Sequence, residues 1–377
     1  MKFIHISDLH LGKRVNEFSM IEDQKYILEQ ILQIADSRGA KVVLAAGDIY
    51  DKSVPPAEAV QLLDFFLTEA FRRGLTVILI SGNHDSAERV AFGEKLLHAS
   101  GIHVAPVYNG KVEPVILHDE YGDINIYPVP YIKPAAVRRF FEEKEIGSYE
   151  DAFAAVMKSL DIDTAKRNIL LAHQFFAGAV RSESEELSLG GLDAVSISVL
   201  PEFDYAALGH VHRPQKLKKE TIRYCGTPLK YSFSEAEDKK SVTVAELKEK
   251  GTVCLETVPL TPLHDMRKIR GTYSEITLLE NYKNTDTSDY MHITLTDEED
   301  IPDVVGKLRV IYPNLMKIEY DNRRTAQNRR IENVSEAEEK TPLELFEDFY
   351  ELQNNQEMSQ QQIAHLEKMI EKVWGEK

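Results

Sequence analysis

The pattern of apolar and polar positions divides the N-terminal part of the chain into alternating strands and helices. Lys2–Ser7 predicts a first strand, and apolar residues spaced by three and four across Ile21–Ser37 predict an amphipathic helix. Two short continuous apolar runs, Lys41–Ala46 and Leu75–Ile80, are typical of strands buried on both faces. Two further helices are expected, one from Pro55-Pro56 to about Arg73 and one over Ala87–Ala99. This βαβαβ order indicates a parallel sheet that helices cover on both sides.

The middle of the chain predicts a second set of strands, mostly short, with two helices among them. The expected elements are several strands between Ile102 and Pro130, helices near Ala135–Glu142 and Tyr149–Leu160, and strands at Asn168–Ala172 and Asp204–Leu208. A hairpin of Ser241–Leu247 and Thr252–Val258 is expected to close this second sheet. We therefore expect one α/β domain over residues 1–264, with two sheets between layers of helices.

The pattern changes after Pro262. Met291–Thr296, Ile301–Ile311 and Leu315–Tyr320 predict a compact βαβ unit, and so a small α+β domain over residues 265–325. Residues 326–340 are charged and poor in apolar anchors, which is typical of a linker. Two helices are expected within residues 341–377.

Each of these C-terminal helices has a start signal and an apolar stripe. The start signals are Thr341–Glu344 and Ser359–Gln362, both of which resemble capping boxes. The stripes consist of Leu345, Phe346, Phe349 and Leu352 in the first helix, and of Ile363, Leu366, Ile370, Val373 and Trp374 in the second. Helices that follow a linker, with no sheet to cover, can dock on a partner or pack on their own chain, and the stripes do not decide between the two.

Composition narrows the class of protein. The net charge of −17 argues against general affinity for nucleic acid over the whole surface, although a local groove with metals remains compatible with it. No run of 18 apolar residues without a charge is present, so we expect no membrane span, and the N-terminus does not resemble a signal peptide. The two cysteines, Cys225 and Cys254, form no CxxC pair and suit a reducing cytosol.

Metal-ligand side chains follow five of the predicted strands. The groups are Asp8-Leu9-His10, Gly47-Asp48-Ile49-Tyr50-Asp51, Gly82-Asn83-His84-Asp85, His173, and Gly209-His210-Val211-His212. Because ligands of open α/β sheets gather outside the carboxyl ends of the strands, we expect these side chains to meet at one place. One histidine or aspartate alone would be an ordinary loop residue, but five such groups at five strand ends predict a site for two divalent metals.

The spacing within the groups supports this prediction. Asp8 and His10 are two residues apart, as are His210 and His212, so each pair points the same way in extended chain. We expect the glycines before three of the groups to adopt backbone angles closed to other residues. Carboxylate, imidazole and amide ligands are typical of Mn²⁺, Fe²⁺, Zn²⁺ or Mg²⁺ sites. The absence of thiolate disfavours a closed structural zinc site. Two metals need a shared anionic bridge, and Asp48 is the natural candidate.

The ordered series of ligand groups resembles the calcineurin-like metallophosphoesterase superfamily. Within it, His5–Gly12, Ala207–Gln215 and Tyr224–Pro228 are similar to the nucleases that repair DNA double-strand breaks, and the resemblance covers essentially the whole chain. It implies that Asp8, His10, Asp48 and His212 hold one Mn²⁺, and that Asp48, Asn83, His173 and His210 hold the other. It also implies that His84 acts near the scissile phosphate, where an imidazole can protonate a leaving 3′-oxygen. Asp51 is expected to orient His84 or a metal ligand, and Asp85 is a possible cap for the following helix.

The resemblance further implies partners and an activity. The expected activity is a Mn²⁺-dependent DNA phosphodiesterase, a 3′→5′ exonuclease on duplex ends and an endonuclease on single strands and hairpins, with Mg²⁺ or another divalent metal as an alternative cofactor. Residues 265–325 would cap the site, the C-terminal helices would bind the coiled coil of an SMC-type ATPase, and helices at residues 56–73 and 87–99 would form a homodimer. Two alternatives stay open. One is a phosphatase or cyclic-nucleotide phosphodiesterase with the same metal site, and the other is an adaptor that tethers an ATPase to DNA.

Overall fold

The structure is a computed structural model of the chain, which divides into two compact units, Met1–Met266 and Arg267–Lys377. It describes residues 1–105, 107–141, 145–182, 185, 193–323, 343, 346, 347, 350 and 358–374. In this part of the chain, no helix is long and apolar enough to cross a membrane.

The first sheet of the N-terminal unit has the strand order β14-β13-β1-β4-β5-β6. Its parallel part consists of β1 (Lys2–Ile6), β4 (Val42–Ala46), β5 (Thr76–Ile80) and β6 (Ile102–Val104). Every residue of β4 is buried, which confirms the prediction from its continuous apolar run. The crossovers contain α1 (Ile21–Arg38) and α2 (Ala57–Arg72), close to the predicted helices.

The second sheet has the order β11-β12-β10-β9-β8-β7. Its parallel strands are β8 (Gly122–Val129), β9 (Arg167–His173), β10 (Tyr205–Gly209) and β12 (Lys219–Tyr224). The antiparallel strands β7 (Val115–Asp119) and β11 (Gln215–Leu217) form its two edges.

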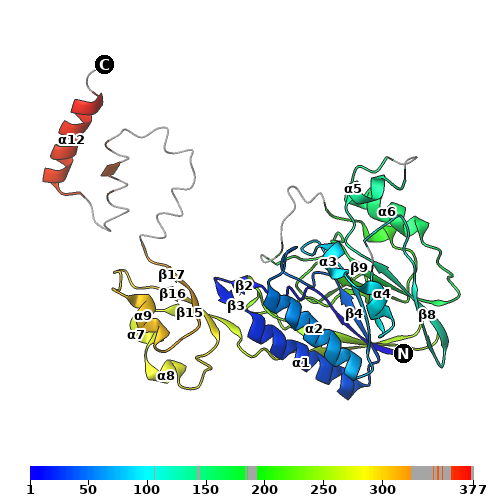
Figure 1. Ribbon diagram of the computed structural model, residues 1–377. Helices are drawn as coiled ribbons and strands as arrows, with labels where there is room; N and C mark the ends of the chain where they lie inside the picture. Colours follow the sequence, from blue (N-terminus) through cyan, green and yellow to red (C-terminus); the bar gives the residue numbers. More distant parts are fainter. Residues whose placement is uncertain are drawn as a thin grey trace. The chain divides into compact units, whose positions relative to one another are not determined.

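The two sheets pack face to face between helices, as predicted (Figure 1). One apolar core joins Leu44 and Ile78 of the first sheet to Ile126, Leu171 and Ala207 of the second. A second core lies on the other face of the second sheet, against helix α6 (Tyr149–Ser159). Helices α1 and α2 cover the side of the first sheet that faces away from α5 (Pro134–Arg138) and α6 (Figure 1). This αββα arrangement brings the carboxyl ends of β1, β4, β5, β9 and β10 to one edge.

Three details differ from the predictions. The hairpin of β13 (Ser241–Leu247) and β14 (Val253–Pro259) belongs to the first sheet, because β13 pairs antiparallel with β1. The predicted helix over residues 87–99 is two short helices, α3 (Ala87–Val90) and α4 (Glu94–His98), separated at Gly93, whose φ is +77°. Helix α5 ends at Arg138, earlier than expected. The remaining short elements of this unit are β2 (Arg14–Val15), β3 (Phe18–Ser19) and the 3₁₀ turns η2 (Ile197–Val199) and η3 (Phe233–Glu235).

The C-terminal unit contains a sheet of order β15-β16-β17. The predicted βαβ unit is present as β16 (Tyr290–Leu295), α9 (Val304–Arg309) and β17 (Leu315–Tyr320), with the two strands parallel. The patterns did not predict β15 (Met266–Gly271), α7 (Tyr273–Ile276) and α8 (Leu279–Tyr282).

Farther along the chain, α12 (Gln360–Trp374) begins where predicted: the backbone N–H of Ser359 donates to Gln362, whose own N–H donates to the Ser359 hydroxyl. The predicted linker, residues 326–340, lies outside the described residues, as does the start at Thr341–Glu344 apart from Leu343.

Candidate metal centre

The five predicted ligand groups all lie in the turns at one edge of the two sheets or at the last residue of a strand. Asp8 and His10 follow β1, Asp48 follows β4, Asn83 and His84 follow β5, His173 ends β9, and His210 and His212 follow β10. Asp8, His10, Asp48, His173, His210 and His212 are all buried, whereas Asn83 and His84 are partly exposed. Donor side chains from both sheets therefore converge on one small volume.

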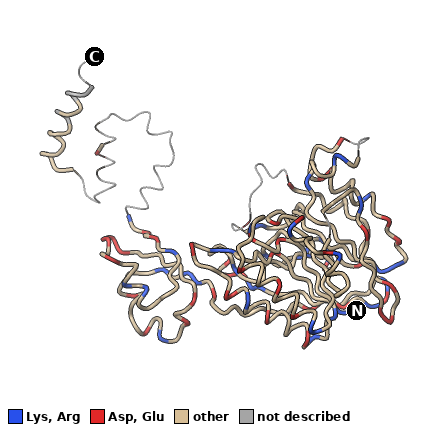
Figure 2. Tube along the Cα trace, in the orientation of Figure 1, with Lys and Arg blue, Asp and Glu red and all other residues tan. Residues whose placement is uncertain are grey.

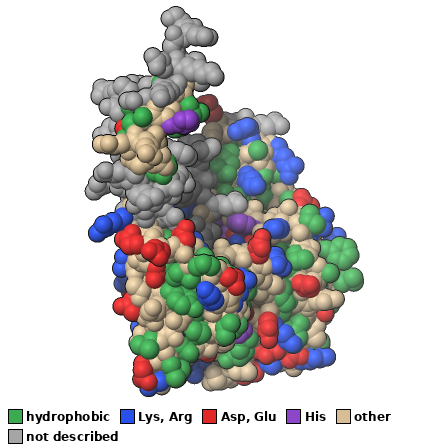
Figure 3. Space-filling view, turned by 90° about the vertical axis from the view of Figure 1, so that its left-hand side faces the viewer, with side chains coloured by type: hydrophobic (Ala, Val, Ile, Leu, Met, Phe, Trp, Pro, Cys, Tyr) green, Lys and Arg blue, Asp and Glu red, His purple; other side chains and the backbone are tan. Residues whose placement is uncertain are grey.

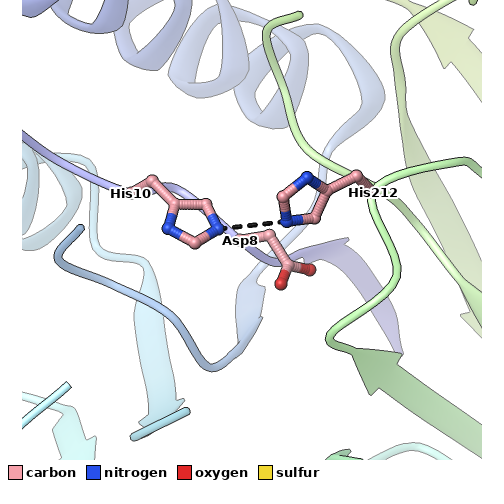
Figure 4. Close-up of side chains that lie close together, drawn as sticks. All are labelled: Asp8, His10 and His212. Carbon is pink, nitrogen blue, oxygen red and sulfur yellow. Dashed lines mark hydrogen bonds between the residues drawn. The ribbon is translucent and has the colours of Figure 1, made fainter. Parts of the chain in front are cut away.

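The first cluster contains Asp8, His10 and His212, which lie close together although they come from segments on different sheets (Figure 4). One ligand atom from each lies within 4.8 Å of the others. The Nε2 atoms of His10 and His212 are 3.2 Å apart. The Asp8 carboxylate also accepts a hydrogen bond from the backbone N–H of His210, at 3.0 Å from Oδ1, which ties the two strand ends together.

The second cluster contains Asp48, Asn83, His173 and His210. Oδ1 of Asn83 lies 3.0 Å from Nε2 of His173 and 2.8 Å from Nδ1 of His210. Oδ2 of Asp48 lies 3.3 Å from Nε2 of His173 and 3.8 Å from Nε2 of His10. The Asp48 carboxylate thus stands between the two clusters, the position that a bridging ligand needs.

The charges in the site suit cations. Burial would raise the pKa of Asp48, but His173 outweighs it and holds this pKa well below its ordinary range, so the carboxylate is ionised. Burial lowers the pKa of His10 and of His210, so both rings are neutral and keep a lone pair for a ligand. Nε2 of His10 and Nδ1 of His210 are the ring atoms that face other donor side chains. The second nitrogen of each ring is buried without a hydrogen-bond partner in the described part of the chain. Burial would lower the pKa of His173, but the Asp48 carboxylate outweighs it and raises this pKa to about 9, so this ring would release its proton on binding a metal. Carboxylate, imidazole and amide oxygen together form a donor set that fits divalent metals.

His84 and Asp51 lie at the rim of the clusters. The backbone N–H of His84 donates to Oδ1 of Asp48 at 2.9 Å, and its ring Nδ1 lies 3.2 Å from the backbone oxygen of Asp51. The Asp51 carboxylate accepts a hydrogen bond from Lys13 and lies 3.7 Å from Nδ1 of His10. Asp51 therefore meets His84 through its backbone, and its carboxylate stands beside His10 instead.

Glycine is required before the ligand groups for two different reasons. Gly47 has a φ of +86°, in line with the predicted need for unusual backbone angles. The expectation of such angles is wrong for Gly82 and Gly209, neither of which has a positive φ. There the cause is close approach: a Cβ at Gly82 would lie 2.0 Å from Oδ1 of Asp48, and one at Gly209 would lie 1.8 Å from the backbone oxygen of Ala46. A side chain at Gly209 would push the two sheets apart, and one at Gly82 would displace Asp48.

The ligand residues themselves have the backbone strain that we expected only of glycine. The φ angles of Asp8, His10, Asp48 and His210 are +53°, +45°, +48° and +102°. Such angles cost roughly 1–3 kcal/mol at each non-glycine residue and occur mostly where function requires them. These left-handed angles occur directly after β1, β4 and β10, in the turns that carry the ligand side chains.

Four residues support the donor clusters, and three of them lie outside the predicted ligand groups. Asp85 is not the cap of the next helix, since Ser86 accepts the N–H of Arg89 there. Its carboxylate instead accepts the backbone N–H groups of Gly82, Ile49 and Tyr50, which joins the turns after β4 and β5. The other three are Glu185, which accepts the backbone N–H of His212, and the buried pair of Glu235 and Lys240.

Two family models and several known proteins match this chain. Residues 1–214 match the family model described as calcineurin-like phosphoesterase, and residues 262–354 match the one described as type 5 capsule protein repressor C-terminal domain. A protein of Staphylococcus epidermidis, named as the SbcD component of the nuclease SbcCD, is 31% identical over 97% of this chain and 98% of its own length. A protein of the same name from Staphylococcus saprophyticus is 30% identical over 98% of each chain. A solved dimetal phosphatase from Danio rerio is 10% identical, with a TM-score of 0.43 over 70% of this chain and 98% of that one.

The site geometry at the shared edge of two sheets, the phosphoesterase match and the full-length relatives lead to one assignment. The chain belongs to the calcineurin-like phosphoesterases and, within them, to the SbcD family of nuclease subunits.

Proposed function

We propose that this chain is the DNA nuclease subunit of an SbcCD-type complex and hydrolyses DNA phosphodiesters with two Mn²⁺ ions, in the cytoplasm. The observation that carries the proposal is the position of Asp48, whose carboxylate faces His10 of one donor cluster and His173 of the other. Relatives named as components of a nuclease, matched over nearly the whole chain, support DNA as the substrate.

Each metal would have its own set of ligands around the shared Asp48. We assign Asp8, His10, Asp48 and His212 to one ion, and Asp48, Asn83, His173 and His210 to the other. Two metals held in this way would activate a water molecule for in-line attack and neutralise the charge that develops on the phosphate.

The chain's own groups complete the reaction. His84 is the most exposed of the site histidines, with 17% of its side chain accessible, so its ring can reach a bound phosphodiester. Its Nδ1 faces the Asp51 backbone oxygen, which leaves Nε2 directed at the clusters, 4.0 Å from Asp48. His84 would deliver a proton to the departing oxygen, and Asp51 would hold both His84 and His10 in place.

A phosphatase or cyclic-nucleotide phosphodiesterase would use the same metal ligands. The nuclease is favoured because the relatives of that name extend over the C-terminal unit as well as the metal site. We propose that residues 265–325 of that unit form a cap that restricts access of duplex DNA, and that residues 326–340 link it to C-terminal helices.

Cleavage of end-labelled DNA by the purified chain tests the function. We expect cleavage of duplex ends and hairpins in Mn²⁺ and none after the metal is chelated, because metals are needed to offset the negative charge on the phosphate oxygens. Phosphoprotein and cyclic nucleotides under the same conditions are the control substrates. Turnover of those substrates without DNA cleavage, even with the partner ATPase present, would assign the chain to the small-molecule enzymes instead.

The surface charge suggests that much of the DNA-binding surface comes from a partner. Lys and Arg are interspersed with Asp and Glu along the chain (Figure 2), and the face seen in Figure 3 has acidic as well as basic side chains. We propose that the C-terminal helices bind an SbcC-like coiled-coil ATPase, for which Ile363, Leu366 and Ile370 of α12 provide an apolar stripe. In the cleavage assay, deletion of residues 341–377 should remove the effect of the added ATPase and leave the basal activity.

A second copy of the chain is the other proposed partner. Phe92 and Leu96, in the segment of α3 and α4, are 85% and 81% exposed, and Phe71 at the end of α2 is more than half exposed. Large exposed apolar side chains in one segment are typical of a protein interface. Replacing Phe92 and Leu96 by glutamate should weaken self-association at least about tenfold, as seen by sedimentation equilibrium. Leu278→Glu, an exposed apolar residue of the other unit, is the control; an unchanged dimer in the double variant would place the interface elsewhere.

A further inference from the structure

A buried ion pair, Glu235 and Lys240, lies outside the set of metal ligands and contacts one of them, His212. Glu235 at the end of η3 is 0% exposed, and Lys240, just before β13, is 5% exposed. Taking two charges out of water costs several kcal/mol for each ion, and a well-packed apolar pair is often as stable. A pair buried so completely therefore calls for a reason other than stability.

Both members of the pair contact His212. Nζ of Lys240 donates to the backbone oxygen of His212 at 2.9 Å, to Oγ1 of Thr227 at 2.8 Å and to the Glu235 carboxylate. Oε1 of Glu235 lies 3.9 Å from Nδ1 of the His212 ring. On the other side of this ring, Nε2 faces Nε2 of His10.

The position of the carboxylate decides which ring nitrogen has the proton. At 3.9 Å it acts through its charge, and a negative charge beside Nδ1 favours the tautomer with the proton on that atom. The lone pair is then on Nε2, which points into the donor cluster. Nζ of Lys240 donates to this carboxylate, so the negative charge beside the ring is held in place by its ion-pair partner.

We infer that Glu235, held by Lys240, is a positioning residue that fixes His212 with the lone pair of Nε2 directed at the metal. Lys240 has two tasks in this arrangement: it keeps Glu235 in place and it anchors the backbone of His212. Carboxylates that hold a ligand histidine in this way typically change metal affinity 10–100-fold when they are replaced. This role rests on the proposed function of His212 as a metal ligand.

The test uses an apolar replacement that preserves the fold. In the double variant Glu235→Leu with Lys240→Met, no charge is left buried and alone, so we expect cooperative unfolding close to that of the parent chain. Glu256→Gln, whose carboxylate pairs with Arg38 at the surface, is the matched control. Metal-free protein labelled with ¹⁵N-histidine reports the tautomer of His212 through long-range ¹H–¹⁵N correlations, and loss of one signal in His212→Gln assigns it.

We expect the proton on Nδ1 of His212 in the parent chain and in Glu256→Gln, and a mixture of tautomers in the double variant. Mn²⁺ titration should show one of the two sites weakened about 10–100-fold and the other unchanged. A parent ring with its proton on Nε2 would overturn the inference, as would a double variant with unchanged tautomer and Mn²⁺ affinity. If His212→Gln binds Mn²⁺ normally, His212 is not a metal ligand and the proposed ligand set is wrong. The tautomer measurement would still show whether Glu235 controls the His212 ring.

Discussion

Replacing Asp48 with asparagine should abolish DNA cleavage, with a loss of about 10²–10³-fold or more, since groups that act directly on developing charge have effects of this size. Oδ2 of Asp48 lies 3.3 Å from Nε2 of His173 and 3.8 Å from Nε2 of His10, so this carboxylate faces donors of both clusters. An amide has no charge and only one oxygen with which to join two cations. We therefore also expect fewer than two tightly bound Mn²⁺ ions per chain, measured by titration.

The substitution leaves the local backbone intact, which makes its result easy to interpret. Oδ1 of Asp48 accepts the N–H of His84, and the amide oxygen of asparagine can accept the same hydrogen bond. Asp64→Asn, on the exposed side of α2, makes the same chemical change away from the site and should be fully active. Cleavage by Asp48→Asn at the parent rate would remove Asp48 from its bridging position.

The positions of the ligand groups could be predicted because they follow from rules of local sequence. Short apolar runs identify β4, β5, β9 and β10, and parallel strands end at a common edge, so the side chains that follow them must meet there. The spacing of the ligands within each group can be read from the sequence without knowledge of the rest of the fold.

The supporting residues could not be predicted in the same way, because their positions depend on long-range pairing. Glu235 and Lys240 lie just before β13 and approach His212 because this strand pairs with β1 of the first sheet, whereas the sequence pattern predicted that its hairpin closes the second sheet. Asp85 was an equally good cap for α3, and only the approach of the turn after β4 makes it an acceptor for Ile49 and Tyr50. Side-chain roles that join distant turns leave no local signal in one sequence.

The break between α3 and α4 has a similar origin. A glycine within an apolar helical pattern can either weaken a continuous helix or end it. The pattern alone favours one continuous helix over residues 87–99, despite Gly93. In the structure, Gly93 takes the left-handed φ that few other residues tolerate, and the helix restarts after it.

Replacing His84 with glutamine should lower the rate of DNA cleavage by about 10²–10⁴-fold, the range that a positioned acid contributes. Glutamine keeps the backbone N–H that donates to Asp48 and much of the volume of the ring, but it cannot deliver a proton. The activity of the variant on an ester whose leaving group needs no proton, such as bis(p-nitrophenyl) phosphate, should fall far less. Single-turnover rates on the two substrates measure the difference.

The same variant distinguishes an acid from a metal ligand. His84 lies within 4.8 Å of ligand atoms of His10 and Asp48, so its ring is close enough to hold a cation with them. If His84 acts as an acid, Mn²⁺ affinity and stoichiometry stay at the parent values while DNA cleavage falls. If it is a ligand, Mn²⁺ binding weakens and both substrates lose activity together. Unchanged cleavage of DNA would exclude both roles, because neither a missing proton donor nor a missing ligand leaves the rate as it was.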